Sequence, residues 1–364
     1  MFIPDILQSS RHPLVILQSS VAQSTLPLLR KVIETSPGKK EQETLLFCFL
    51  HLPSSLINED AAGLTAYDRI ASVPGYDDSW IDPRDFISNA VENCELLSSS
   101  PLAAFQPVIP QGPSQQLHVV IDSVDTLLSD IGSVAESYKI LRGLLSKLLA
   151  RPSPSRLTLH LQSTCPLLPL LLQTSFSSTL AQLIAHPPAL LVHLATEYLT
   201  PPPPASPEPK FWGVFLPVSE READLERIIF GQDGEGSGAS GEFVVEVILR
   251  GGGDHSGRRK AVERVLEGWD VTQSSPVELT SMESLKKVFG KTPVEEAAPD
   301  PTQNLSFNLN LTPSQQQARS QVPLPYAHEG KALETPAPTA GSILYDPDSA
   351  DDIDDDDPDE DLDI

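Results

Sequence analysis

Along the first 200 residues, short runs of apolar residues alternate with segments in which apolar residues recur every three or four positions. The runs are typical of strands buried on both faces, and the spacing of three or four is typical of amphipathic helices. Their alternation predicts an α/β fold with a mostly parallel sheet flanked by helices. We expect strands at residues 13–17, 45–52, 117–121 and 156–161, helices at about 24–36, 136–149 and 178–184, and a further apolar stretch at 189–194.

A polyproline run at residues 201–204 interrupts this alternation and predicts a rigid connector. Beyond it, residues 242–249 form an apolar run and residues 251–257 form a glycine-rich turn. Residues 259–269 are the expected second strand of an antiparallel hairpin. We expect the hairpin to belong to the same domain, so that a single α/β domain spans residues 1–270.

The segment 301–326 combines a predicted strand with a predicted short helix. Thr312, Pro313 and Gln315 match the N-cap, the first helical position and the glutamine of a capping box. The strand has one apolar face and nothing local to cover it, so we expect it to dock on a partner. The apolar positions are Leu305, Phe307, Leu309 and Leu311, and they alternate with serine and asparagine.

Composition sets the C-terminal part of the chain apart. Proline accounts for 35 of 364 residues, about twice the usual share. From residue 271 onward the chain is rich in proline, serine, glutamine and acidic residues, which predicts a linker over 271–300 and a disordered acidic tail over 327–364. The net charge is −25, and twelve acidic residues lie between Asp346 and the C-terminus, which leaves −13 for the 345 residues before them. This charge argues against nonspecific nucleic-acid binding by the whole surface but leaves a local basic patch open.

The three cysteines, Cys48, Cys94 and Cys165, are far apart and form no CxxC pair. They predict neither a zinc site nor a disulfide framework, and a reducing compartment is expected. The N-terminus lacks the features of a signal peptide, and the longest apolar stretch, residues 167–172, is far shorter than the roughly 20 residues of a membrane span. We therefore expect a soluble intracellular protein without a membrane partner.

The first predicted strand leads into a turn and a helix, where a nucleotide-binding α/β protein places the P-loop motif GxxxxGK[ST]. Gln18 and Gln23 stand where both glycines belong, Ser24 stands where the lysine belongs, and only Thr25 matches. Glycines let the backbone wrap the phosphates and the lysine neutralises them. Two interpretations remain open: a lost nucleotide site whose architecture is kept, and an ordinary strand–helix turn.

Asp122 follows the predicted strand 117–121, at the position of the Walker B aspartate that holds magnesium in P-loop enzymes. The alternative is a helix N-cap or a loop residue, which is common after any buried strand, and Asp125 lies one turn further on. His118 and His160 lie in predicted strands and are expected to be core residues. The sequence contains no convincing catalytic set, so we predict no catalytic residue, no metal site and no cofactor.

The densest basic cluster is formed by Arg258, Arg259 and Lys260. Arg250 and Arg264 lie close to it in sequence, and a second cluster is formed by Lys286, Lys287 and Lys291. Two interpretations remain open for the first cluster: a solvated surface, and a contact with RNA phosphates.

The C-terminal third resembles the fungal members of the Elongator protein five family. The resemblance rests on residues 304–319 (NLSFNLNLTPSQQQAR), residues 322–326 (VPLPY) and residues 343–348 (ILYDPD), which run into the acidic terminus. The resemblance implies a RecA-like α/β domain that lacks the Walker motifs, which is compatible with residues 1–270.

It also implies a hexameric accessory ring with two sibling RecA-like subunits, attached to the catalytic Elongator subcomplex in the cytoplasm and nucleus. The resemblance further implies that the ring binds tRNA and supports modification of the wobble uridine, and that this subunit is not itself an enzyme. The competing hypotheses are a stand-alone RecA-like ATPase and a nuclear scaffold that binds basic proteins through its acidic tail.

Overall fold

The computed structural model describes residues 1–9, 11–35, 42–57, 63–72, 80–98, 116–231, 241–251 and 262–290, together with Ser314 and Gln317. The chain divides into two units, residues 1–294 and 295–364. All helices and strands named below belong to the first unit. The predicted docking segment at 301–326 and the acidic tail at 327–364 lie almost entirely outside the described residues.

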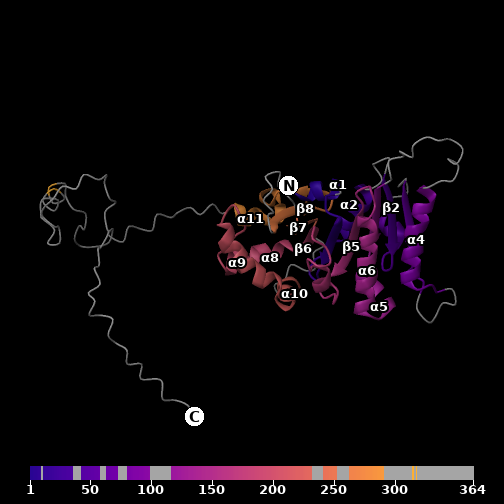
Figure 1. The fold of residues 1–364 in the computed structure, drawn as a ribbon. Helices are drawn as coiled ribbons and strands as arrows, with labels where there is room; N and C mark the ends of the chain where they lie inside the picture. The colour runs from indigo at the N-terminus through magenta and orange to yellow at the C-terminus, as the bar shows by residue number, and fades with distance from the viewer. Residues whose placement is uncertain are drawn as a thin grey trace, which may run out of the picture. The chain divides into compact units, whose positions relative to one another are not determined.

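Nine strands of the described chain form one sheet in the order β3-β2-β4-β5-β1-β6-β7-β8-β9 (Figure 1). The strands from β3 to β6 in this order pair in parallel, whereas β7, β8 and β9 are antiparallel additions. The predicted mostly parallel sheet is therefore confirmed. The strands are β1 Leu14–Ser19, β2 Gln42–Cys48, β3 Leu64–Asp68, β4 Gln116–Ile121, β5 Arg156–Gln162, β6 Leu180–His186, β7 Glu242–Arg250, β8 Glu263–Asp270 and β9 Ser275–Val277.

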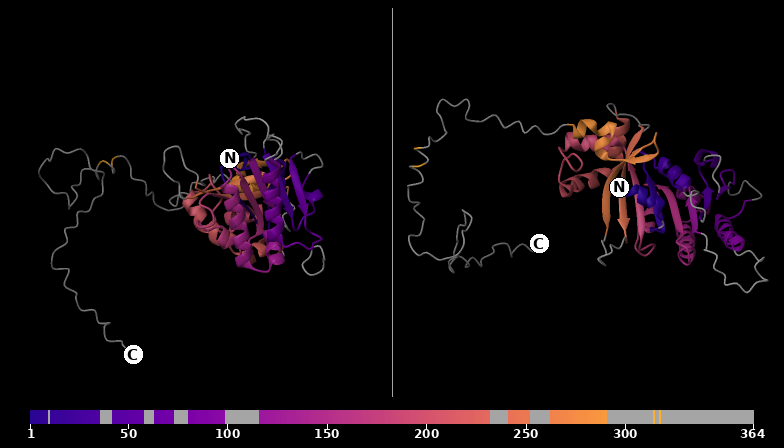
Figure 2. Two further views of the ribbon diagram at one scale, coloured as in Figure 1. Left: turned by 45° about the vertical axis from the view of Figure 1, so that its right-hand side comes forward. Right: turned by 90° about the horizontal axis from the view of Figure 1, so that it is seen from above.

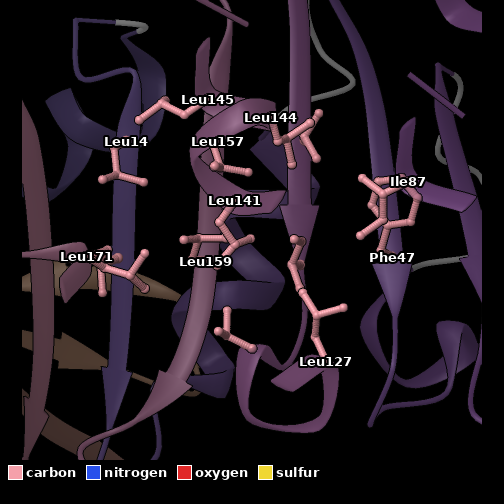
Figure 3. Close-up of a cluster of buried hydrophobic side chains, with 14 of the residues drawn as sticks. Leu14, Phe47, Ile87, Leu127, Leu141, Leu144, Leu145, Leu157, Leu159 and Leu171 are labelled. Carbon is pink, nitrogen blue, oxygen red and sulfur yellow. The ribbon is translucent and has the colours of Figure 1, made fainter. Parts of the chain in front are cut away.

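Helices cover both faces of the parallel strands, which explains why the central strands are apolar on both sides. On one face, Leu141 and Leu145 of α6 point into a cluster that contains Leu14 and Leu157 (Figure 3). On the other face, α1 and α2 pack against the alternate residues of β1. The helices up to residue 150 are α1 Ile3–Gln8, α2 Leu26–Thr35, α3 Pro53–Leu56, α4 Pro83–Ser98, α5 Val124–Ile131 and α6 Val134–Leu149.

A third apolar cluster lies at the end of the sheet away from α4, where α8, α9 and α10 are grouped (Figures 1 and 2). Val244 of β7 is part of this cluster, so these helices cover the antiparallel end of the sheet. The remaining helices of this region are α7 Leu168–Leu171, α8 Pro188–Glu197, α9 Glu208–Ser219 and α10 Glu222–Phe230.

The predicted hairpin is confirmed, because β7 and β8 pair antiparallel with Phe243 beside Trp269. It also belongs to the same sheet as the parallel strands. The fold continues beyond the expected domain end at residue 270, through β9, the 3₁₀ turns η2 Leu279–Ser281 and η3 Glu283–Leu285, and the helix α11 Lys286–Phe289. Met282 and Leu285 are fully buried in the third cluster. The linker expected over 271–300 therefore begins later than the composition predicts, since a few well-spaced apolar residues anchor a polar segment.

Three further segments differ from the prediction. The segment expected as a helix at 178–184 is the strand β6, which lies between β1 and β7. The stretch 57–114, for which no elements were predicted, contains β3 and α4, and residues 205–230 contain α9 and α10. Short apolar runs do not distinguish a buried strand from a buried helix, and the run in β6 is only seven residues long. In the described part of the chain, no helix has the length and apolar character to cross a membrane.

Candidate site at the carboxyl edge of the parallel strands

The neighbouring strands β1 and β5 send the chain to opposite faces of the sheet. After β1 the chain enters α2, whose Leu28 packs in the same cluster as Val15. After β5 it enters α7, whose Leu171 packs with Leu14 on the other face. In open α/β sheets, ligands bind in the crevice that such a reversal opens at the carboxyl ends of the strands. The predicted P-loop position and Asp122 both lie at this edge.

The turn at the P-loop position is closed by its own hydrogen bonds. The backbone N–H of Ser20 donates to the carbonyl of Gln23 (2.9 Å), and the N–H of Gln23 donates to Ser20 Oγ (3.1 Å). The N–H of Thr25 donates to Ser19 Oγ (2.9 Å). In a P-loop, backbone N–H groups of this turn point at phosphates. Here these three already have partners inside the chain, so they are not free to bind an anion.

The side chains at the four P-loop positions are also engaged or buried. Gln18 accepts a hydrogen bond from Gln182 Nε2 of β6 (2.6 Å). Ser24 Oγ accepts from a backbone N–H at the start of α2 (3.1 Å). Gln23 and Thr25 are buried. The arrangement is that of a strand–helix turn held together by its own side chains.

Asp122 acts as a cap for the chain that follows β2. Its carboxylate accepts hydrogen bonds from the backbone N–H groups of Phe49 (2.7 Å), Leu50 (3.0 Å) and His51 (2.7 Å). The side chain is completely buried, and His51 Nδ1 lies 3.5 Å from Oδ2. A carboxylate that binds three amides is occupied in holding the backbone, as the alternative of a loop-capping residue predicts.

His160 of β5 connects Asp122 to the turn. Its Nδ1 lies 2.5 Å from the carbonyl oxygen of Asp122, and its Nε2 lies 2.9 Å from Ser19 Oγ. A carbonyl oxygen only accepts, so Nδ1 carries the proton and Nε2 accepts from the Ser19 hydroxyl. Burial lowers the pKa of His160 and favours this neutral form. The predicted core role of His160 therefore includes a polar link that its sequence position alone does not reveal.

The remaining chemistry-bearing groups near this edge are also occupied. Asp125 accepts a hydrogen bond from the backbone N–H of Gln162 (2.9 Å). Burial raises the pKa of Cys48 to about 12 and that of Cys165 to about 11, so neither is a thiolate at neutral pH. Within the described residues, no group of three histidine, cysteine, aspartate or glutamate side chains could hold a metal ion.

A cavity of about 610 Å³ lies beside this edge, between α7 on one side and α9 and α10 on the other. Gln18, Ser163 and Gln182 line it at the carboxyl ends of β1 and β5 and along β6. Among the polar residues that line it, Glu246 of β7 is the least exposed, at 3%. Sequence reasoning missed this cavity, because its walls come from segments that are distant along the chain.

Glu246 is held between two basic groups. His186 Nε2 lies 2.9 Å from Oε2, and Arg264 Nε lies 3.2 Å from Oε1. Register explains the arrangement: Glu246 pairs with Ile184 on β6 and with Leu266 on β8, two residues from His186 and Arg264 respectively. A buried carboxylate requires such partners.

The basic residues considered in the sequence analysis differ in their surroundings. Arg250 donates to the carbonyls of Leu172 (2.5 Å) and Ser177 (2.7 Å), so it binds backbone within the fold. Lys286 pairs with Glu283. The cluster of Arg258, Arg259 and Lys260 lies outside the described residues, as do Leu305, Phe307, Leu309 and Leu311.

The fold and this edge define a class of protein. β1 leads into the P-loop position, Asp122 directly follows β4, and β5 lies between these two strands in a mostly parallel sheet. This is an α/β protein whose mostly parallel sheet is covered by helices on both faces. The family model for Elongator subunit Iki1 matches residues 3–346, and the chain belongs to that family.

Curated relatives match a short part of the chain. Elongator complex protein 5 of Danio rerio is 42% identical over 73 residues, which is 19% of this chain and 25% of the relative. The protein of the same name from Mus musculus is 47% identical over 70 residues, which is 18% of this chain and 23% of the relative. The chain thus matches about a quarter of the length of these relatives. The family prediction is confirmed, and the resemblance to its fungal members stays a prediction.

Among solved structures, a KaiC-like protein from Pyrococcus horikoshii aligns over 73% of this chain and 88% of its own, with 7% identity and a TM-score of 0.37. A likeness of this size carries no argument about function.

Proposed function

We propose that this chain is a non-catalytic subunit of the Elongator complex and that it forms a hexameric accessory ring with two sibling RecA-like subunits. In this proposal the ring binds tRNA and supports wobble-uridine modification by the catalytic subcomplex, in the cytoplasm and nucleus. The chain contributes its fold as a packing unit. Its membership of the Elongator subunit Iki1 family supports the proposal.

The proposal rests on which side chains are engaged and which are exposed at the carboxyl edge of the sheet. The polar groups of this edge that would serve a nucleotide are engaged inside the chain, whereas large apolar side chains are exposed there. Val21 in the turn after β1 is 56% exposed, and Leu50 and Leu52 after β2 are 52% and 57% exposed. Exposed apolar side chains at one edge suit contact with another protein.

Mass measurement of the co-expressed subunits tests the ring. The proposal expects a complex with two copies of each of three subunits in native mass spectrometry. Leu50→Glu together with Leu52→Glu should break it, because charges would be buried in the contact. Leu149→Glu is the matched control, since Leu149 is 57% exposed at the end of α6. An intact ring with the double variant would refute packing through this edge.

The sequence adds a second contact to the proposal, through the segment 301–326. Phe307→Asp with Leu309→Asp should weaken assembly, because both residues belong to the predicted apolar face. Asn308→Asp with Asn310→Asp places the same charge on the polar face and should leave the ring mass unchanged. An equal ring mass for the two double variants would show that this segment has no docking role.

The proposed tRNA contact rests on Arg258, Arg259 and Lys260. Changing all three to Glu should lower tRNA affinity and flatten its salt dependence without changing the ring mass. The same charge change at Lys210, Arg221 and Arg227 is the control. An affinity equal to that of the control variant would assign the cluster to a solvated surface.

Two outcomes would replace the proposal. ATP hydrolysis by the isolated chain that Asp122→Asn abolishes would establish a stand-alone ATPase. Loss of all protein partners on deletion of residues 346–364, with no sibling subunits among them, would establish the acidic-tailed scaffold.

A further inference from the structure

The cavity beside the carboxyl edge carries an excess of negative charge. Glu220, Glu222, Glu246 and Arg264 line it, so its formal charge is −2 with histidine neutral. Both oxygens of Glu246 are already paired with basic groups. The uncompensated charge therefore belongs to Glu220 and Glu222, which lie where α9 meets α10; Glu220 is exposed and Glu222 is half-buried.

Glu222 keeps capacity for a further donor. Ser163 donates to its Oε1, and an ionised carboxylate has about four acceptor positions. Apolar side chains also line the cavity, with Leu168 of α7 and Leu216 and Leu225 of α9 and α10 among them. An alkyl stem can lie against such walls while its charged end reaches the carboxylates. The volume of about 610 Å³ is within the usual range for a small-ligand site.

The same negative charge disfavours a nucleotide, whose phosphates RecA-like ATPases bind at the carboxyl edge of the sheet. Phosphates would meet two carboxylates, and the turn at 20–25 has no lysine and no free amide among the three described above to offset the repulsion. We propose that the cavity instead receives a cationic group on an alkyl stem, the guanidinium or ammonium of an Arg or Lys side chain from a neighbouring protein chain.

The neighbouring chain is the favoured source because of the surroundings of the cavity. Ser20 lines the cavity, and the next residue, Val21, is one of the exposed apolar side chains of the edge. A partner that covers Val21 would therefore present side chains at the cavity mouth. This part of the inference rests on the proposed ring, whereas the preference for a cation rests only on the cavity.

The full-length chain can be tested with L-argininamide, a soluble stand-in for an arginine side chain, by saturation-transfer NMR and calorimetry. Binding at millimolar concentration is expected, with weakening at high salt. L-citrullinamide, which has nearly the same shape without the charge, should bind at least tenfold more weakly, and ATP should not compete. Equal binding of the two amides, or displacement by ATP, would overturn the proposal.

Variants at the cavity mouth locate the binding. Glu220→Gln with Glu222→Gln should weaken L-argininamide binding at least tenfold. Glu226→Gln is the matched control, because Glu226 is an exposed residue of the same α10 helix. Both variants retain the Glu246 pairs, and circular dichroism checks that they are folded. Unchanged affinity in the double variant would place the cation elsewhere and refute the site.

Repeating the L-argininamide titration on the assembled ring identifies the source of the cationic group that fills the cavity. If a neighbouring side chain fills the cavity, L-argininamide binding should disappear in the ring and return when the ring is dissociated. Equal affinity in both states would overturn the neighbour as the source and leave a free amine such as spermidine, which can be titrated in the same way. If no ring forms, the proposed function fails while the titration on the isolated chain still decides the cavity.

Discussion

Replacing Asp122 by Ala should lower the free energy of unfolding by about 2–6 kcal/mol in the absence of any nucleotide or magnesium. The magnitude follows from the three amides that the carboxylate binds. Phe49 is 4% exposed, so its N–H would be left without water, at a cost of about 1–3 kcal/mol. Leu50 and His51 are partly exposed and their N–H groups can reach water, so each loses only the net value of an ordinary hydrogen bond, about 0.5–1.5 kcal/mol.

Urea unfolding followed by circular dichroism measures this change, with Asp85→Asn as the control because Asp85 is an exposed carboxylate in the first turn of α4. Asp122→Asn should lie between wild type and Asp122→Ala, since its amide retains one acceptor oxygen and adds an N–H₂ group that faces other donors. The reasoning would be refuted by an Asp122→Ala variant within about 0.5 kcal/mol of wild type. Loss of magnesium binding with unchanged stability would assign Asp122 the Walker B role.

Two further predictions follow from the packed domain. Burial lowers the pKa of His160, His118 and His12, and unfolded histidine titrates near about 6.5. Below that pH the unfolded chain therefore binds protons that the folded chain does not. Urea unfolding should show the full free energy of unfolding at about pH 7.5 and a lower one at about pH 5.5. In His118→Gln the free energy of unfolding should fall less over this range. Leu199 has a positive φ of 47° and its side chain is 76% exposed. Because glycine adopts a positive φ without strain, Leu199→Gly should raise the free energy of unfolding by about 0.5–1 kcal/mol in thermal or urea unfolding, whereas Leu199→Ala should not.

The parts of the fold that could be predicted are those in which one local signal dominates. The strands around residues 13–17 and 117–121 are mainly apolar, whereas in 156–161 leucine alternates with polar residues; both faces of each strand are buried. β6 was predicted as a helix because Ala181 and Gln182 dilute its apolar run, and only its position between β1 and β7 makes it a strand. α9 was not predicted, since it contains Pro217 in its interior.

For the site, the sequence located the positions but not the partners. Asp122 stands at the predicted end of a strand, yet its three donors come from a loop more than 70 residues away along the chain. Glu246 and Arg264 were visible as charges, but their pairing depends on the register of β7 and β8. No local pattern encodes contacts of this kind, because they depend on how the strands are ordered in the sheet.

The closed turn after β1 also makes a nucleotide site hard to introduce at this edge. A glycine at position 18 would remove the partner of Gln182, and a glycine at position 23 would replace a buried side chain. Ser19 would still hold the N–H of Thr25. Each of these single substitutions therefore removes a stabilising contact before a phosphate can supply a new one. A route from this turn to an ATPase would pass through less stable intermediates, which is a barrier to evolution and to protein engineering alike.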